Sequence, residues 1–123
     1  MKTRVSAPFA LLLCIATSAF AQTREGNWDI RFEPTAKLQS QAPIPYQITV
    51  KDSRGKPVIE AQVTLQIETT DHQDTKVYKA PAINPGVYIA KPEFPHAGQW
   101  NVYVEVRRNG AMSARTIEYS VPD

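Results

Sequence analysis

Apolar and polar residues alternate strictly along much of this chain, which leaves few folds open to it. In the run that begins at Trp100, for example, Trp100, Val102 and Val104 alternate with Asn101 and Tyr103. A period of two puts successive side chains on opposite faces and predicts β-strands with one buried face and one solvated face. No stretch shows the helical period of about 3.6 residues. The alternating runs are 28–33, 46–51, 63–68, 100–107 and 117–121, and two less regular runs are 75–80 and 87–90.

Turn-forming residues separate these runs. The segment Asp52-Ser53-Arg54-Gly55 ends on a glycine that can take a positive φ at little cost. Asn109-Gly110 is a strong hairpin signal. This spacing favours an all-β fold, an immunoglobulin-like antiparallel β-sandwich of about seven strands. The short run 75–80 carries lysines and suits a protected sheet edge, and the run 27–33 is the candidate for another edge.

The start of the chain predicts export. Two basic residues, Lys2 and Arg4, precede a mostly apolar run over 7–16, and Ala19-Phe20-Ala21 places small residues around a large one. This order predicts a cleavable signal peptide over residues 1–21. The apolar run is shorter than the roughly 20 residues that a membrane-spanning helix needs. An uncleaved N-terminal anchor is therefore the less favoured alternative.

The remaining residues, 22–123, are predicted to form one domain in the periplasm. The single cysteine, Cys14, lies inside the apolar run and follows Leu13, where a lipoprotein signal has a small residue. The exported domain then has no thiol for a disulfide, a metal or nucleophilic catalysis. Burial alone must stabilise it, which is feasible for a domain of about 100 residues. No later segment is apolar enough to span a bilayer.

Charge and motif content argue against two large classes of function. Removal of Lys2 and Arg4 with the signal leaves 12 basic residues (14 − 2) against 12 acidic ones. This balance provides no cationic excess for general binding to nucleic acid or to an anionic membrane. The sequence contains no Gly-x-Ser-x-Gly elbow and no glycine loop that would hold a phosphate. It therefore predicts no enzyme and no nucleic-acid partner, and it favours binding to another envelope protein.

Three residues are candidate metal ligands. Copper(I) prefers methionine sulfur or imidazole, and copper(II) prefers imidazole with other nitrogen or oxygen ligands. The exported part of the chain offers His72, His96 and Met112. Both histidines fall in predicted loops and could meet at one end of a sandwich. The alternative is that they are solvated loop residues with no ligand.

Aromatic residues allow two interpretations. Trp28, Tyr88 and Trp100 could stack on a ligand, but each begins or lies in a predicted strand and is better explained as a core or corner residue. Tyr88 is expected to bond to backbone near a turn, as corner tyrosines do. Tyr103 alternates out of phase with Trp100, so we expect it to face solvent or a partner.

Two stretches of the sequence resemble a known family. Pro85-Gly86-Val87-Tyr88, followed by Gly98-Gln99-Trp100 and alternating valines, is similar to the YtkA-like and FixH-like exported bacterial domains, and the segment from Gly55 to Val63 fits the same family. The resemblance implies that Gly86, Tyr88, Gly98 and Trp100 are structural motif residues. It also implies an immunoglobulin-like sandwich, a periplasmic or cell-surface location, and association with metal handling or respiratory-oxidase assembly. It implies no catalytic residues.

The sequence thus predicts an exported, non-catalytic accessory or binding domain, and the resemblance implies that it assists copper homeostasis or oxidase assembly. Two alternatives stay open. One is a direct periplasmic metal carrier that uses His72, His96 and Met112. The other is a carbohydrate- or peptide-binding module that uses exposed aromatic residues such as Tyr103.

Overall fold

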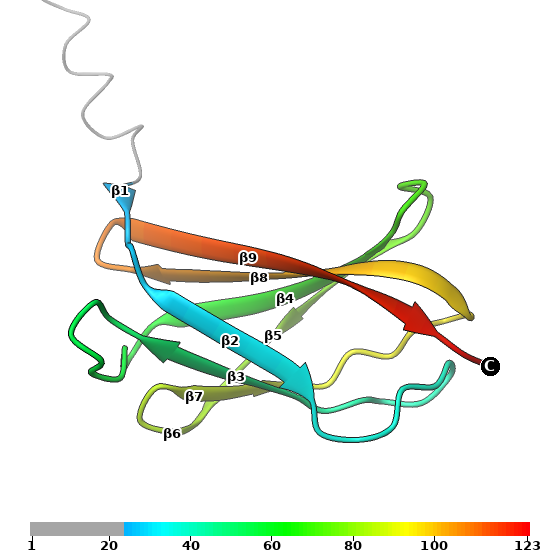
Figure 1. Ribbon diagram of the computed structural model, residues 1–123, viewed down its shortest axis with the longest axis horizontal. Helices are drawn as coiled ribbons and strands as arrows, with labels where there is room; N and C mark the ends of the chain where they lie inside the picture. Colours follow the sequence, from blue (N-terminus) through cyan, green and yellow to red (C-terminus); the bar gives the residue numbers. More distant parts are fainter. Residues whose placement is uncertain (1–23) are drawn as a thin grey trace, which may run out of the picture.

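Two β-sheets pack face to face in the structure, a computed structural model that describes residues 24–123 (Figure 1). The predicted signal peptide, residues 1–21, lies outside the described residues. Between residues 24 and 123 there is no helix with the length and apolar character to cross a membrane. The strands are β1 (Arg24–Glu25), β2 (Asp29–Pro34), β3 (Tyr46–Lys51), β4 (Gln62–Thr69), β5 (Thr75–Lys79), β6 (Ala82–Asn84), β7 (Val87–Ala90), β8 (Gly98–Arg108) and β9 (Ala111–Val121).

The strand order is that of an immunoglobulin-like domain. One sheet has the order β2-β3-β7-β6, and the other has the order β1-β9-β8-β4-β5. These correspond to strands A-B-E-D packed against G-F-C, with β1 and β5 added at the two edges of the second sheet. The predicted fold class is confirmed, and β5 and β2 are sheet edges as predicted. β1 differs from the antiparallel prediction, because it runs parallel to β9.

The described chain has nine strands where the sequence predicted about seven. β1 and β6 contain only two and three residues, which is too short to show a period. β9 begins at Ala111, whereas the sequence predicts a start near Ile117. The predicted strand is too short because Ala114, Arg115 and Thr116 are all exposed and interrupt the alternation. The sequence therefore predicted only the second half of β9.

The core lies between the two sheets and is built from the buried face of each strand. Trp100 and Tyr88 belong to it, with exposed fractions of 0% and 1%, as predicted. Trp28 is only half buried and packs against the core margin, so the prediction that it is a core residue holds in part. Burial of each large apolar side chain contributes roughly 1.5–3 kcal/mol, most of which conformational entropy offsets.

The β8–β9 hairpin determines which backbone groups of β9 face outward. Asn109 and Gly110 have φ values of 51° and 78°, the two positive values of a type I′ turn, and Arg108 pairs with Ala111. The pair that flanks such a turn is hydrogen bonded, so odd-numbered residues of β9 bond to β8. Even-numbered residues direct their N–H and C=O groups to the other side. The Gly26 N–H donates to the Met112 carbonyl over 2.8 Å, in agreement with this register.

The first strand covers only the beginning of this outward side. β1 pairs with Ala111 and Met112, and the chain then crosses to the other sheet through Asn27, whose φ is 55°. Figure 1 shows β1 beside the start of β9 and β2 lying in the opposite sheet. In the part of the chain that the structure describes, no strand pairs with β9 on this side from residue 114 onward.

Candidate functional site

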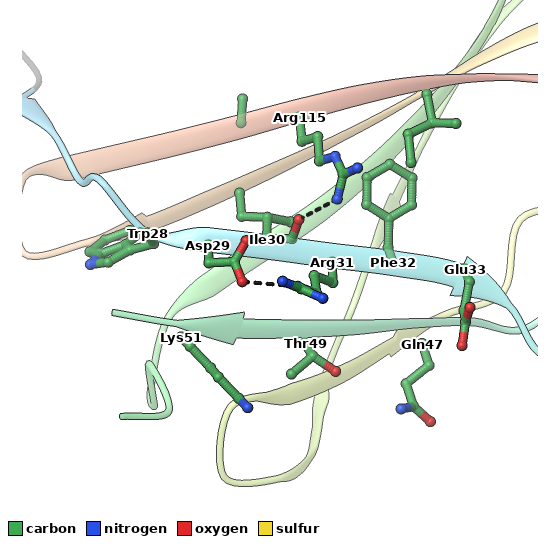
Figure 2. Close-up of a pocket in the computed structure, with 12 residues that line it drawn as sticks. Trp28, Asp29, Ile30, Arg31, Phe32, Glu33, Gln47, Thr49, Lys51 and Arg115 are labelled. Carbon is green, nitrogen blue, oxygen red and sulfur yellow. Dashed lines mark hydrogen bonds and ion pairs between the residues drawn. The ribbon is translucent and has the colours of Figure 1, made fainter. Parts of the chain in front are cut away.

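An open groove of about 1030 Å³ runs along β2, between β9 and the outer face of β3 (Figure 2). It is lined by each residue from Trp28 to Glu33, by Gln47, Thr49 and Lys51 of β3, and by Ala114, Arg115 and Ile117 of β9.

Arg115 joins the two sheets at this groove. It pairs with Val104, whose side chain is fully buried, so the Arg115 side chain points toward the space between the sheets. Its Nη1 donates a hydrogen bond of 2.9 Å to the Ile30 carbonyl, and its guanidinium carbon lies 6.0 Å from the centre of the Phe32 ring. Figure 2 shows the arginine reaching from β9 to β2. Among the described residues, Arg115 forms no ion pair with a carboxylate.

Aromatic side chains lie between the sheets on the same side of the sandwich. The Tyr46 and Tyr119 rings meet edge to face with centroids 5.6 Å apart, and the Phe32 ring lies 6.4 Å from that of Tyr46. The Tyr46 hydroxyl is buried and has no hydrogen-bond partner among the described residues. Burial, together with the neighbouring Tyr119, raises the pKa of Tyr46 well above its ordinary value. Native proteins rarely leave such a group unpaired.

Charges on the outer side of the groove are partly neutralised. Arg31 donates through Nε to Asp29 over 3.0 Å, and both side chains are exposed. Glu33 and Lys51 also line the groove. With Arg115, the lining contains three basic residues and two acidic ones. The groove therefore carries a small positive excess, and Arg115 is its cation nearest the open edge of β9.

The other edges are shorter or protected. β5 carries Lys76 and Lys79, and β6 has three residues between Pro81 and Pro85. The free side of β2 is occupied in part by Arg115. β9 contains neither lysine nor proline, and its outward side is uncovered for more than half of its length. Apart from the inward-facing Arg115, this edge has no protecting residue, and it can act as a template for pairing with another strand.

The two predicted histidine ligands lie at one end of the sandwich and bond to carboxylates. His72 Nδ1 lies 3.0 Å from Glu68 Oε2, and His96 Nε2 lies 2.8 Å from Asp74 Oδ2. A hydrogen bond to the Ala97 carbonyl makes the largest contribution to raising the pKa of His96 above its ordinary value, and the hydrogen bond to Asp74 adds to it. Between residues 24 and 123, no group of three or more His, Cys, Asp or Glu residues is arranged to hold a metal ion.

Met112 lies at the opposite end. It pairs with Arg107, seven residues along β8 from Trp100 (107 − 100), whereas His96 precedes that strand. At roughly 3.3 Å per residue, this separation is about 23 Å or more. The structure brings His72 and His96 to the same end but does not bring Met112 to them. The three residues cannot coordinate one ion together, and copper binding by the histidines stays a prediction.

Tyr103 lies on the outer face of the five-stranded sheet, opposite in phase to Trp100, as predicted. It is half buried between Gln66 and Thr116 of the adjacent strands. Its hydroxyl donates to Glu105 Oε1 over 2.9 Å, and Arg107 bonds to the same carboxylate and lowers the pKa of Glu105. The phenol is thus occupied by the protein's own side chains. Its use in carbohydrate binding stays a prediction.

A family model described as YtkA-like matches residues 23–105, which is more than half of the chain. The chain belongs to the YtkA-like family. No curated protein matches it. The matched range ends within β8, so β9 lies beyond it. The FixH-like part of the resemblance stays a prediction.

The two stretches that carry the resemblance touch one another in this YtkA-like domain. The Tyr88 hydroxyl donates to the Val58 carbonyl over 2.7 Å and accepts from the Ala61 N–H over 3.3 Å. Gly86 has a φ of 75°, and a Cβ at this position would lie 2.5 Å from the Pro57 side chain. Only glycine fits this position without displacement. The expected backbone bond of Tyr88 is confirmed.

The remaining motif residues anchor the start of β8. The Trp100 Nε1–H donates to the His96 carbonyl over 3.0 Å, which satisfies its polar group in the core. Gly98 has a φ of 136°, a conformation that side-chain-bearing residues rarely adopt. Both residues of the YtkA-like domain thus lie where β8 begins, one bonded to the preceding loop and one in the left-handed region of φ.

Sequence reasoning missed Arg115, an exposed arginine at the margin of the sandwich that bonds across to β2. A signal for it was present. The alternating run 117–121 predicts that Ile117, Tyr119 and Val121 share one face, and Arg115, two residues before Ile117, has the same phase. A basic residue in the phase of the core face indicates an edge strand. In this YtkA-like domain the arginine lies at the edge of the sandwich and not in its centre.

Proposed function

We propose that this protein is an exported, non-catalytic domain that binds another protein of the cell envelope through the β2–β9 side of the sandwich. The observation that carries this function is the uncovered edge of β9, residues 114–120, beside the groove. Sandwich domains of this type commonly bind partners through edge strands and end loops. Family membership supports an accessory role and does not specify a pathway. We place the partner in metal handling or oxidase assembly, as the resemblance implies.

The chemistry of the groove suits binding better than catalysis. Its lining contains no histidine, cysteine or serine, the residues most often used as bases or nucleophiles. Its polar side chains carry carboxylate, guanidinium and ammonium groups, one amide and one hydroxyl. Such groups orient a partner and provide hydrogen bonds without a chemical step.

Site-directed photocrosslinking in cells tests the binding side. A benzophenone side chain at position 116, on the outward side of β9, is expected to give a discrete crosslinked product. The matched control places the same group at position 75, on the exposed edge strand β5 at the other side of the sandwich. A product at 116 but not at 75 supports the proposed side. Equal products, or a product at 75 alone, would show that the partner binds elsewhere.

Mass spectrometry of the periplasmic fraction tests export separately. The expected species begins at about Gln22, because the Ala19-Phe20-Ala21 site is cleaved after its second alanine. An intact chain in the membrane fraction would instead support the uncleaved anchor.

A further inference from the structure

The open side of β9 presents a regular row of backbone donors and acceptors. Ala114, Thr116, Glu118 and Ser120 direct their N–H and C=O groups away from β8, in the register set by the hairpin. An extended segment laid along this row would continue the five-stranded sheet. Main-chain bonds then provide affinity, and alternate side chains provide specificity.

We propose that β9 binds an extended segment of the partner as an added antiparallel strand, and that Arg115 selects a segment with a carboxylate opposite it. This inference deepens the proposed function and rests on it. The antiparallel direction follows from the greater stability of antiparallel pairs per residue.

Arg115 makes the edge selective because its side chain faces the space that the added strand would border. The residue paired with Arg115 places its side chain on the same face of the sheet. The guanidinium bonds to the Ile30 carbonyl and has no carboxylate partner among the described residues. An apolar residue opposite it would remove water from an unpaired charge, which disfavours binding. A carboxylate would instead form charge-assisted hydrogen bonds.

A second copy of this chain does not provide that carboxylate. When two β9 edges pair antiparallel through their even-numbered residues, Arg115 faces an odd-numbered residue of the other copy. The odd-numbered residues of β9 are Ala111, Ser113, Arg115, Ile117, Tyr119 and Val121, and none is acidic. The acidic residue of β9, Glu118, has the opposite phase. Arg115 therefore disfavours self-pairing while it favours an acidic partner strand.

The neighbouring positions extend the expected pattern. Ile117 and Tyr119 share the phase of Arg115 and are half buried, so they favour apolar residues opposite them. Glu118 lies exposed on the outer face and favours a basic residue opposite it. Along its own direction, the partner segment reads apolar, basic, apolar, any residue, acidic.

Peptide binding followed by NMR tests this mode of recognition. The probe is the blocked peptide Thr-Val-Lys-Val-Thr-Glu-Thr, and the matched control has Gln in place of Glu. At millimolar peptide, we expect shifts and slowed exchange of the amides of residues 114, 116, 118 and 120. The Glu peptide should bind about tenfold more tightly than the Gln peptide, the ratio expected for one charge-assisted contact.

Two protein variants assign the selectivity. Arg115→Gln should remove the difference between the peptides, whereas Arg54→Gln, which alters an exposed arginine in the turn after β3 and outside the groove, should preserve it. Thr116→Pro removes one outward N–H and should weaken the binding of both peptides.

The proposed recognition would be overturned by three results. These are no shift at millimolar peptide, equal affinity for the two peptides, or shifts centred on β5. A crosslink at position 116 combined with any of these results would preserve the proposed function. If no crosslink forms at position 116 and no peptide binds along β9, both the proposed function and the proposed recognition are overturned.

Discussion

At the scale of single residues, two buried tyrosines differ in how their hydroxyl groups are satisfied. Tyr88 and Tyr46 have exposed fractions of 1% and 0%. The Tyr88 hydroxyl bonds to two backbone groups, whereas the Tyr46 hydroxyl bonds to none of the described residues. Removing the hydroxyl should therefore have opposite effects at the two positions.

Tyr88→Phe should destabilise the fold by about 1–3 kcal/mol, because the buried Val58 carbonyl and Ala61 N–H lose their side-chain partner. Urea unfolding measures the change. Tyr78→Phe is the matched control, since the Tyr78 hydroxyl makes only exposed bonds of 3.3 Å and 3.4 Å to Glu93. Similar losses in the two variants would mean that the Tyr88 bonds have no special weight.

Tyr46→Phe should leave stability unchanged or raise it by up to about 1–2 kcal/mol, because an unpaired buried hydroxyl carries a desolvation cost. The same urea experiment measures the change. The ring contacts with Phe32 and Tyr119 are retained in this variant. A loss of stability would show that the Tyr46 hydroxyl has a partner in solution.

At the scale of elements, the register of β9 distinguishes neighbouring residues by their backbone bonds. Thr116 pairs with Tyr103 and directs its N–H outward, whereas Ile117 pairs with Val102 and directs its N–H to β8. Thr116 is exposed and Ile117 is half buried against the core, so alanine variants at both positions control for the loss of the side chains.

Ile117→Pro should strongly destabilise or unfold the domain, because it removes a ladder bond inside the sheet. Thr116→Pro should be folded, since proline is tolerated where the N–H of an edge strand faces solvent. Circular dichroism and urea unfolding compare the variants. Equal destabilisation would show that β9 has a different register.

The loops after β4 and before β8 are tied by His96 and Asp74, and this contact depends on pH. The pKa of His96 is raised in the folded chain above the ordinary value of 6.5. The folded state therefore binds more protons, and its contribution to stability is fully present below about pH 6.5. That contribution declines as the pH rises through the raised pKa.

Urea midpoints from pH 5 to pH 8 should accordingly fall with rising pH in the native protein and fall less in His96→Gln. The effect should be small and sensitive to salt, because both side chains are 52% exposed. A midpoint that rises over this range, or identical slopes in the two proteins, would contradict the contact.

At the scale of the whole molecule, burial between the sheets replaces disulfide bonds as the source of stability. The single cysteine of the chain precedes the described residues. Trp100 is among the largest fully buried side chains and contacts Phe94 with ring centroids 5.5 Å apart. Small domains have a total stability of about 5–15 kcal/mol, so loss of one such residue removes a large share.

Trp100→Ala should cost about 3–5 kcal/mol and come close to unfolding the domain. Trp28→Ala should cost less, because Trp28 is half buried at the core margin. Thermal unfolding with and without reductant measures both effects, and reductant should change neither protein. Similar losses from the two tryptophans would place Trp28 deeper in the core than the structure does.

Much of the fold could be predicted from local pattern, but the candidate site could not. The run 46–51 alternates over its full length, and it forms β3 with the predicted face buried. β1 and β6 were too short to produce a pattern. The candidate ligands His72, His96 and Met112 were chosen by chemistry alone, and their separation along β8 depended on strand pairing.

The sequence by itself determined the all-β class, the strand faces and the burial of Tyr88 and Trp100. These properties follow from side-chain period and turn chemistry, which act over a few residues. Only the tertiary structure decided which edge is uncovered and that Arg115 lies over β2. The bond from Arg115 to Ile30 joins residues 85 positions apart in the chain. Such contacts depend on how the two sheets pack and on the point where the first strand crosses between them, and no local period encodes either.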